Sequence, residues 1–160
     1  MTEREAMRAT MTTAPDFDFD FSELTLLSRF ASPDWRPNML IVCPETMRES
    51  AIKQVALWCP PPVHVCRVPG PLDLPPTCGT LVLSDLAEME VTEQLALYDW
   101  MSKNQGTRVI SITSADLPGL IRDARFLEGL YYRLNTVRVD AQESHSPRRT
   151  WPPRGKICLW

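Results

Sequence analysis

Two glutamates, a threonine and an arginine gather at one predicted strand-to-helix turn. The apolar run 39–43 predicts a buried strand, and residues 44–49 (Pro-Glu-Thr-Met-Arg-Glu) lead from it into a helix. A turn in this position binds phosphate when a Gly-x-x-x-x-Gly-Lys-Ser/Thr loop curls its backbone N–H groups around the oxygens. The first glycine of this chain is Gly70, far beyond the turn. Because only glycine adopts the required angles cheaply, and because Glu45 and Glu49 would repel a polyphosphate, we expect the turn not to cradle one.

A further carboxylate closes another predicted strand. The apolar run 80–83 is followed by Ser84 and Asp85. A carboxylate at the end of a strand can support a metal ion or orient a water molecule. Many strands of α/β proteins end in aspartate, so Asp85 by itself does not identify a reaction.

The cysteines offer a different chemistry. Their number, five, is odd, no two are spaced Cys-x-x-Cys, and His64 and His145 form no ligand pair with them. We therefore predict no zinc site and no disulfide framework, but reduced thiols in a cytosolic protein. One alternative remains open at Cys43, which ends a strand just before a helix, where a thiolate can be stabilised. A buried, inert thiol is the simpler interpretation.

The elements that must position these residues alternate along the chain. With 160 residues, 44% of them hydrophobic and 23% charged, the sequence suits one globular domain. Hydrophobic patterns predict strands at 39–43, 63–68, 80–83, 108–112 and 136–139, and helices at 45–58, 92–103, 116–120 and 124–134. Alternating strands and helices predict an α/β fold, a three-layer parallel sheet of about five strands with flanking helices. In the helix at 92–103, we expect Leu95, Tyr98 and Met101 to form the apolar face, with Leu97 and Trp100 beside it.

The ends of the chain differ from its middle in composition. We expect a flexible N-terminal arm at 1–21, an α/β domain at 22–140 that opens with a short helix at 22–31, and an irregular, proline-containing basic tail at 141–160. Residues 16–21 alternate strictly between aspartate and phenylalanine. This alternation fits a strand with one wet face, a docking segment that folds on a partner, or aromatic residues that pin the arm to the domain. No signal peptide or membrane span is evident, which favours a cytoplasmic location.

Three strings in the second half of the chain resemble the AAA+ domain of the bacterial sigma-54-dependent transcription activators. Residues 79–86 read Gly-Thr-Leu-Val-Leu-Ser-Asp-Leu, where the family has Gly-Thr-Leu-Phe-Leu-Asp-Glu. Residues 108–117 begin Arg-Val-Ile, like the family's next string, and residues 125–135 end with the family's Leu-Tyr-Tyr-Arg-Leu-Asn. The resemblance lies mainly within 79–139, with a looser match over 22–58. It implies the core of a P-loop NTPase.

The same resemblance indicates which residues of the subunit's own nucleotide site differ from those of the family. The glycines and lysine of the phosphate loop are gone, and Arg48 stands near the place of the lysine. Ser84 takes the position of the aspartate that supports magnesium, and Asp85 that of the glutamate that orients water. Ser114 replaces the sensor asparagine. The sigma-contacting Gly-Ala-Phe-Thr-Gly-Ala loop, the helical lid and a C-terminal helix-turn-helix for DNA are not found in the sequence.

One residue that serves a neighbouring subunit is kept. Family members extend two arginines toward the neighbour's nucleotide; the first falls on Leu127 and the second on Arg133. The resemblance therefore implies a catalytically inactive AAA+-like domain, with no catalytic residue, metal or cofactor. It would act on a protein partner, an intact AAA+ activator or a second copy, with Arg133 at the subunit interface and no direct contact with DNA or membrane.

An alternative function keeps some nucleotide chemistry. In this interpretation the chain is a weak ATP-binding protein or a residual ATPase in transcription regulation, and Glu45, Thr46, Arg48 and Asp85 form its site. A chain without a selected role is also compatible with these losses.

Overall fold

The strands form one parallel sheet. A computed structural model describes residues 36–141; the predicted arm at 1–21, the predicted helix at 22–31, Cys158 and almost all of the predicted tail lie outside this range. The described strands are β1 (Met39–Val42), β2 (Val63–Arg67), β3 (Thr80–Ser84), β4 (Arg108–Thr113) and β5 (Val137–Asp140). Their order across the sheet is β2-β3-β4-β1-β5, and every pairing is parallel. The predicted fold class is confirmed.

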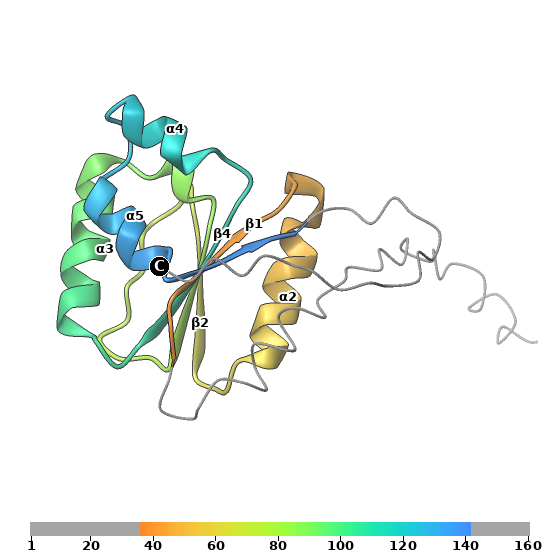
Figure 1. Ribbon diagram of the computed structural model, residues 1–160. Helices are drawn as coiled ribbons and strands as arrows, with labels where there is room; N and C mark the ends of the chain where they lie inside the picture. Colours follow the sequence, from red (N-terminus) through yellow and green to blue (C-terminus); the bar gives the residue numbers. More distant parts are fainter. Residues whose placement is uncertain (1–35, 142–160) are drawn as a thin grey trace, which may run out of the picture.

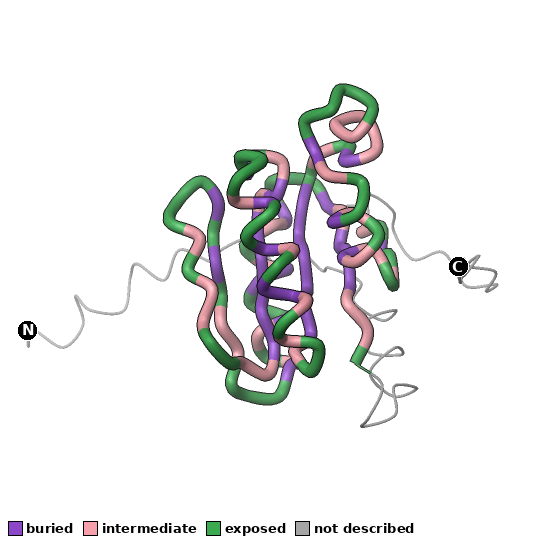
Figure 2. The backbone as a smooth tube through the Cα atoms, turned by 90° about the vertical axis from the view of Figure 1, so that its left-hand side faces the viewer, coloured by how far each residue is buried: buried purple, intermediate pink, exposed green. Residues whose placement is uncertain are grey.

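Helices cover both faces of this sheet. The helix α2 (Arg48–Trp58) lies on one face, while α3 (Val91–Lys103), α4 (Leu117–Arg122) and α5 (Glu128–Leu134) lie on the other (Figure 1). Every residue of β3 and β4 is buried, which explains the apolar run in the middle of β3; β4 also buries three polar residues, Arg108, Ser111 and Thr113. Figure 2 shows the buried strands between more exposed outer segments.

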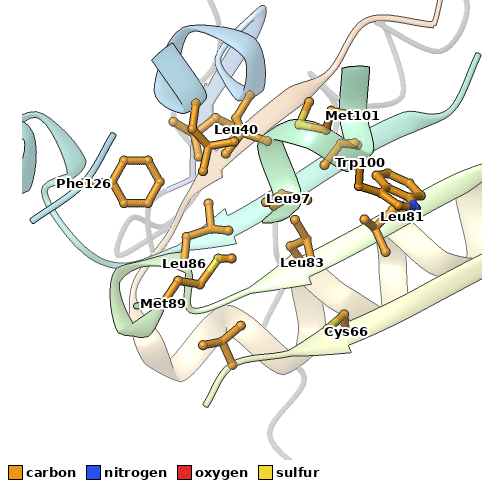
Figure 3. Close-up of a cluster of buried hydrophobic side chains, with 14 of the residues drawn as sticks. Leu40, Cys66, Leu81, Leu83, Leu86, Met89, Leu97, Trp100, Met101 and Phe126 are labelled. Atoms are coloured by element: carbon orange, nitrogen blue, oxygen red, sulfur yellow. The ribbon is translucent and has the colours of Figure 1, made fainter. Parts of the chain in front are cut away.

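The core is divided by the sheet into two clusters. The larger lies under α3 and α5 and includes Leu83, Leu97 and Phe126 (Figure 3). The smaller lies under α2 and includes Ile52 and Ile110. In the described part of the chain, no helix combines the length and the apolar composition needed to cross a bilayer.

The buried face of α3 differs from our expectation. Leu95 is 51% exposed, whereas Gln94 is fully buried. Its amide nitrogen donates to the carbonyls of Met89 and Arg125, at 2.9 and 3.0 Å, and its oxygen accepts the backbone N–H of Leu127 at 2.8 Å. Burial of an amide is tolerated when its donors and acceptor are satisfied in this way. The prediction for Leu95 was therefore wrong because a polar residue holds the inner position.

The start of the last helix also differs. We predicted a helix from Ala124, but α5 begins at Glu128. Ala124 adopts a left-handed conformation with φ 56°, and it closes α4. The N–H of Arg125 donates to the carbonyl of Leu120 at 2.8 Å, and that of Ala124 to Ile121 at 3.0 Å, the two bonds of a Schellman motif. The chain thus leaves the helix before α5 starts.

Candidate functional site

The turn after β1 is tight. The N–H of Cys43 donates to the carbonyl of Thr113 at 3.0 Å, so this residue still belongs to the sheet. Pro44 follows with φ −55° and ψ 150°, and its carbonyl accepts the N–H of Met47 at 3.0 Å to close a 3₁₀ turn, η1 (Glu45–Met47). A phosphate-binding loop arcs outward and turns several N–H groups toward its centre. This chain passes directly from strand to helix and forms no such arc.

An ion pair spans the carboxyl end of the sheet. Arg48, in the first turn of α2, places Nη1 2.7 Å from Oδ1 of Asp85, and 3.6 Å from Oε1 of Glu45. The strand β4 separates β3 from β1, so the pair crosses over its end. The hydrogen bond with Asp85 raises the pKa of Arg48 above its ordinary value. In open α/β sheets, the region outside the carboxyl ends of the strands is where ligands bind.

The backbone presents Asp85 to this arginine in an unusual conformation. Asp85 has φ 60° and ψ 43°, in the left-handed region. Its N–H donates to the carbonyl of Ile112 at 3.0 Å, and its own carbonyl accepts the N–H of Glu88 at 3.0 Å. Aspartate tolerates this region better than most residues because its short polar side chain can bond locally. The chain turns sharply there into η2 (Leu86–Glu88).

The side chains at this end of the sheet enclose an open cavity of about 450 Å³. Its ionisable lining comprises four carboxylates and two arginines, a formal charge of 2 − 4 = −2: Glu45, Glu49, Asp85, Glu88, Arg48 and Arg67. Arg67 forms a forked ion pair with Glu49, and this contact lowers the pKa of the Glu49 carboxyl below its ordinary value. An excess of carboxylates disfavours a polyanion in the cavity.

The structure brings three of the four predicted nucleotide-site residues together. Glu45, Arg48 and Asp85 line the cavity, whereas Thr46 is exposed on η1 and is not among the lining residues. Sequence reasoning missed Arg67 as a member of this site. Its position at the end of β2 is the signal that would have found it, because the carboxyl ends of parallel strands meet at one edge of the sheet.

These groups do not fit a magnesium-bound triphosphate. The position of the magnesium-supporting aspartate is the buried Ser84, and the guanidinium of Arg48 is engaged by Asp85. Among residues 36–141, no group of three or more histidine, cysteine or acidic side chains is placed to hold a metal ion. The arginines of this cavity pair with its carboxylates: Arg48 with Asp85 and Glu45, and Arg67 with Glu49.

The environment of Cys43 opposes a reactive thiolate. The residue is buried, with 3% of its surface exposed. Burial raises the pKa of the Cys43 thiol above its ordinary value, although the nearby Arg48 lowers it in part. A thiol is nucleophilic only when ionised, so this environment supports the inert interpretation.

Arg133 lies at the opposite, amino end of the sheet. Its Nη1 donates to Oγ of Ser102 at 2.6 Å, and its guanidinium lies 4.1 Å from the centre of the Tyr98 ring. None of the ion pairs described within residues 36–141 includes it. It lines a second cavity of about 350 Å³, and Arg36 and Asn104 are also part of this lining. Leu127, where the family has its other arginine, packs half-buried against the larger core cluster.

Comparison with known proteins relates part of the chain to one family. Residues 74–143 match the family model of the sigma-54 interaction domain. No curated protein sequence matches the chain.

Solved structures extend the likeness to the fold. The structure of NtrX from Brucella abortus in complex with ATP superposes with a TM-score of 0.59 at 18% sequence identity, over 76% of this chain and 36% of that one. NtrX in complex with ADP gives 0.57 at 18% identity, over 76% and 35%. The P-loop NTPase domain of a sigma-54 activator from E. coli gives 0.49 at 19%, over 76% and 98%. The chain thus shares the fold of the matched part of NtrX and spans about a third of the length of the NtrX structures.

Proposed function

Starting from a chain that is related to the AAA+ sigma-54 interaction domain over residues 74–143, we propose a catalytically inactive domain that acts by binding protein. Its partner is an intact sigma-54-dependent activator, or a second copy of the chain. By taking a place beside active subunits, it modulates the activity of an activator ring.

The observation that carries this proposal is the ion pair between Arg48 and Asp85, at 2.7 Å. By resemblance, Arg48 stands near the place of the phosphate-binding lysine and Asp85 at that of the glutamate that orients water. In this chain the two side chains bind each other. In an ATPase, the groups at these positions contact phosphate and water instead. Phosphoryl transfer depends almost wholly on positioning and charge stabilisation, and the loss of one such group typically lowers the rate by about a hundredfold or more. Loss of the loop, the lysine and the magnesium ligand together leaves no useful turnover.

The binding role is supported by the residues that remain. The groups that would serve the subunit's own nucleotide have changed, while Arg133, by resemblance the group that serves a neighbour's nucleotide, is kept. Its guanidinium is held in one orientation by Ser102 and Tyr98. A cation fixed in this way loses little side-chain entropy on binding, which favours a role at an interface.

Nucleotide binding is tested by calorimetric titration with ATP and magnesium. We expect no saturable heat up to about 1 mM nucleotide, a concentration that corresponds to a binding free energy near −4 kcal/mol. A dissociation constant tighter than this would reject the inactive domain. It would favour instead the alternative, a weak nucleotide site at Glu45, Thr46, Arg48 and Asp85, three of which line the cavity at the carboxyl end.

Ring modulation is tested with a purified full-length activator. We expect the chain to co-purify with it and to change its ATPase rate in proportion to the fraction added. Arg133→Met, which keeps the apolar stem over Tyr98, should abolish the change in rate, whereas Arg138→Met should leave it intact, because Arg138 pairs with Asp140 on the exposed surface. Absence of co-purification, or equal behaviour of the two folded variants, would contradict the proposal.

A further inference from the structure

Strand β2 leaves one side of its backbone open, and we propose that residues 16–21 of the same chain pair with it as a sixth strand. The order β2-β3-β4-β1-β5 places β2 at an edge of the sheet. This inference is independent of nucleotide binding and of ring modulation.

The hydrogen bonds next to β2 show which of its backbone groups face outward. The carbonyl of Pro62 accepts from Gly79 and Thr80, and the N–H of Val68 donates to the carbonyl of Ser84. Even-numbered residues therefore point their N–H and C=O groups toward β3. Within a parallel ladder, these groups alternate from one side to the other along the strand. The backbone N–H and C=O groups of the odd-numbered residues Val63 and Val65 consequently point away from β3, toward the open edge of the sheet.

The outward groups have no partner among residues 36–141. No backbone or side-chain hydrogen bond described in this range involves the N–H or the C=O of Val65 on its open side. Val65 is also 37% exposed, so its apolar side chain is only partly covered. An edge strand with open backbone groups and an exposed apolar side chain is a template for another strand.

The side chain of Val65 lies on the α2 face of the sheet. Val63, two residues earlier on the same strand face, packs against the core cluster under α2. At the other end of the strand, Arg67 joins Glu49 at the start of α2. A strand added beside β2 would thus bring one of its two faces against Val65 and leave the alternate side chains on the opposite face.

The segment 16–21 has the pattern that such a position requires. Its phenylalanines share one face and its aspartates the other, because side chains alternate along a strand. With Phe19 opposite Val65, the aromatic face covers the exposed valine, and a cross-strand pair of an aromatic and a β-branched residue is favourable. The aspartates would lie on the opposite face, where the loop after β2 already contacts the strand: the carbonyl of Pro71 accepts from Cys66, and Asp73 lies 3.5 Å from His64. Three charges along the new edge would oppose the addition of yet another strand.

The length of the connection allows this pairing in one chain. Five adjacent strands, from the added one to β1, are separated by four spacings, about 19 Å in all. Residues 22–35 connect the segment to Arg36. Even with the predicted helix at 22–31, the connection spans about 15 Å of helix and about 13 Å of extended chain. In an antiparallel arrangement, residue 21 would lie at the same end of the sheet as Arg36.

Amide hydrogen exchange of the full chain, followed by NMR, tests the pairing. We expect the Val65 amide to exchange at least about tenfold more slowly than an unprotected amide. In the triple variant Phe17→Ser, Phe19→Ser and Phe21→Ser, this protection should be lost. The Cys66 amide, which faces β3, should stay protected and serves as the internal control. The matched triple variant with aspartates 16, 18 and 20 changed to asparagine should keep the protection of Val65.

Several results would overturn the inference. An unprotected Val65 amide in the unmodified chain, or protection that survives in the folded serine variant, excludes residues 16–21 as the occupant. Protection that disappears on dilution assigns the edge to a second copy of the chain. A further readout needs no variant: in the unmodified chain, nuclear Overhauser contacts between the Phe19 ring and the Val65 methyl groups should be present, and their absence would reject the pairing.

Discussion

Polar side chains stand at the centre of two regions of this molecule, but they are satisfied in different ways. At the carboxyl end of the sheet, Arg48 and Asp85 bond to each other across an open cavity. Under α3 and α5, Gln94 bonds to three backbone groups in a packed interior, and Arg133 of α5 stacks on the Tyr98 ring beside the cavity at the amino end. By resemblance, the first region differs from the sigma-54 interaction domain at residues that would do chemistry, while residues 130–135 of the second region agree with it. Much of the resemblance thus reflects the scaffold.

The largest effect is expected in the packed region. Leu130 belongs to the kept string and is fully buried. Leu130→Ala should lower the free energy of unfolding by about 2–5 kcal/mol, through lost burial and the cavity left behind. Denaturant unfolding measures this. Tyr132→Ala, two residues along and 66% exposed, is the control and should stay within about 0.5 kcal/mol of the unmodified chain. Similar losses in both variants would mean that the string is not held by packing.

A somewhat smaller effect is expected at Gln94. Gln94→Leu keeps the volume but leaves two carbonyls and one N–H without their partner, which should cost about 2–3 kcal/mol. The reciprocal change in the next residue, Leu95→Gln, is the control, because that side chain is half exposed. Thermal unfolding of both variants decides which position is internal. A greater loss at Leu95 would restore the face predicted from periodicity.

These two positions show how far the sequence could predict the fold. The parallel sheet and its strands followed from apolar runs and alternation, because burial on both faces leaves a direct trace in composition. The inward position of Gln94 could not be predicted from the local sequence, since its hydrogen-bond partners lie up to 33 residues away. The break at Ala124 was also missed, because an alanine in the left-handed region carries none of the usual glycine signal.

The candidate site was predicted in part for a similar reason. The grouping of Glu45, Arg48 and Asp85 was predicted from the resemblance to the AAA+ domain, and strand ends that share one edge of a parallel sheet account for it. The direct pairing of Arg48 with Asp85, and the exposure of Thr46, depend on side-chain directions within a tight turn. Spacing along the sequence does not encode these directions.

A third prediction concerns the open region. A double-mutant cycle with Arg48→Met and Asp85→Asn should give a coupling energy of about 1 kcal/mol, because the pair is well aligned but partly reached by water. The coupling should decrease with added salt. Unfolding of the two single variants and the double variant measures it. A coupling as large as the loss at Leu130 would erase the contrast between the two regions.

The smallest effect is expected at Glu49, on the rim of the same cavity. Arg67 lowers the pKa of Glu49 in the folded chain, so this contact contributes stability above the ordinary pKa of the carboxyl. That contribution is lost as the pH falls through the depressed folded value. Because both side chains are more than half exposed, it should amount to only a few tenths of a kcal/mol.

Acid titration measures this contribution. Unfolding free energies of the unmodified chain and of Glu49→Gln should differ above about pH 5 and converge as the solution approaches about pH 3. Glu88→Gln, a carboxylate of the same cavity for which no ion pair is described in residues 36–141, is the matched control. A difference that grows on acidification would reverse the assigned sign.

The place of β1 within the sheet has a consequence for synthesis. This strand is made before the other four, yet both of its neighbours, β4 and β5, are encoded near the end of the described domain. On the ribosome, the apolar segment Met39–Val42 must therefore wait without a partner until residues beyond 108 have emerged. Long-range pairing of this kind is slow and leaves apolar strands exposed to aggregation, so we expect β1 to be most vulnerable over this interval.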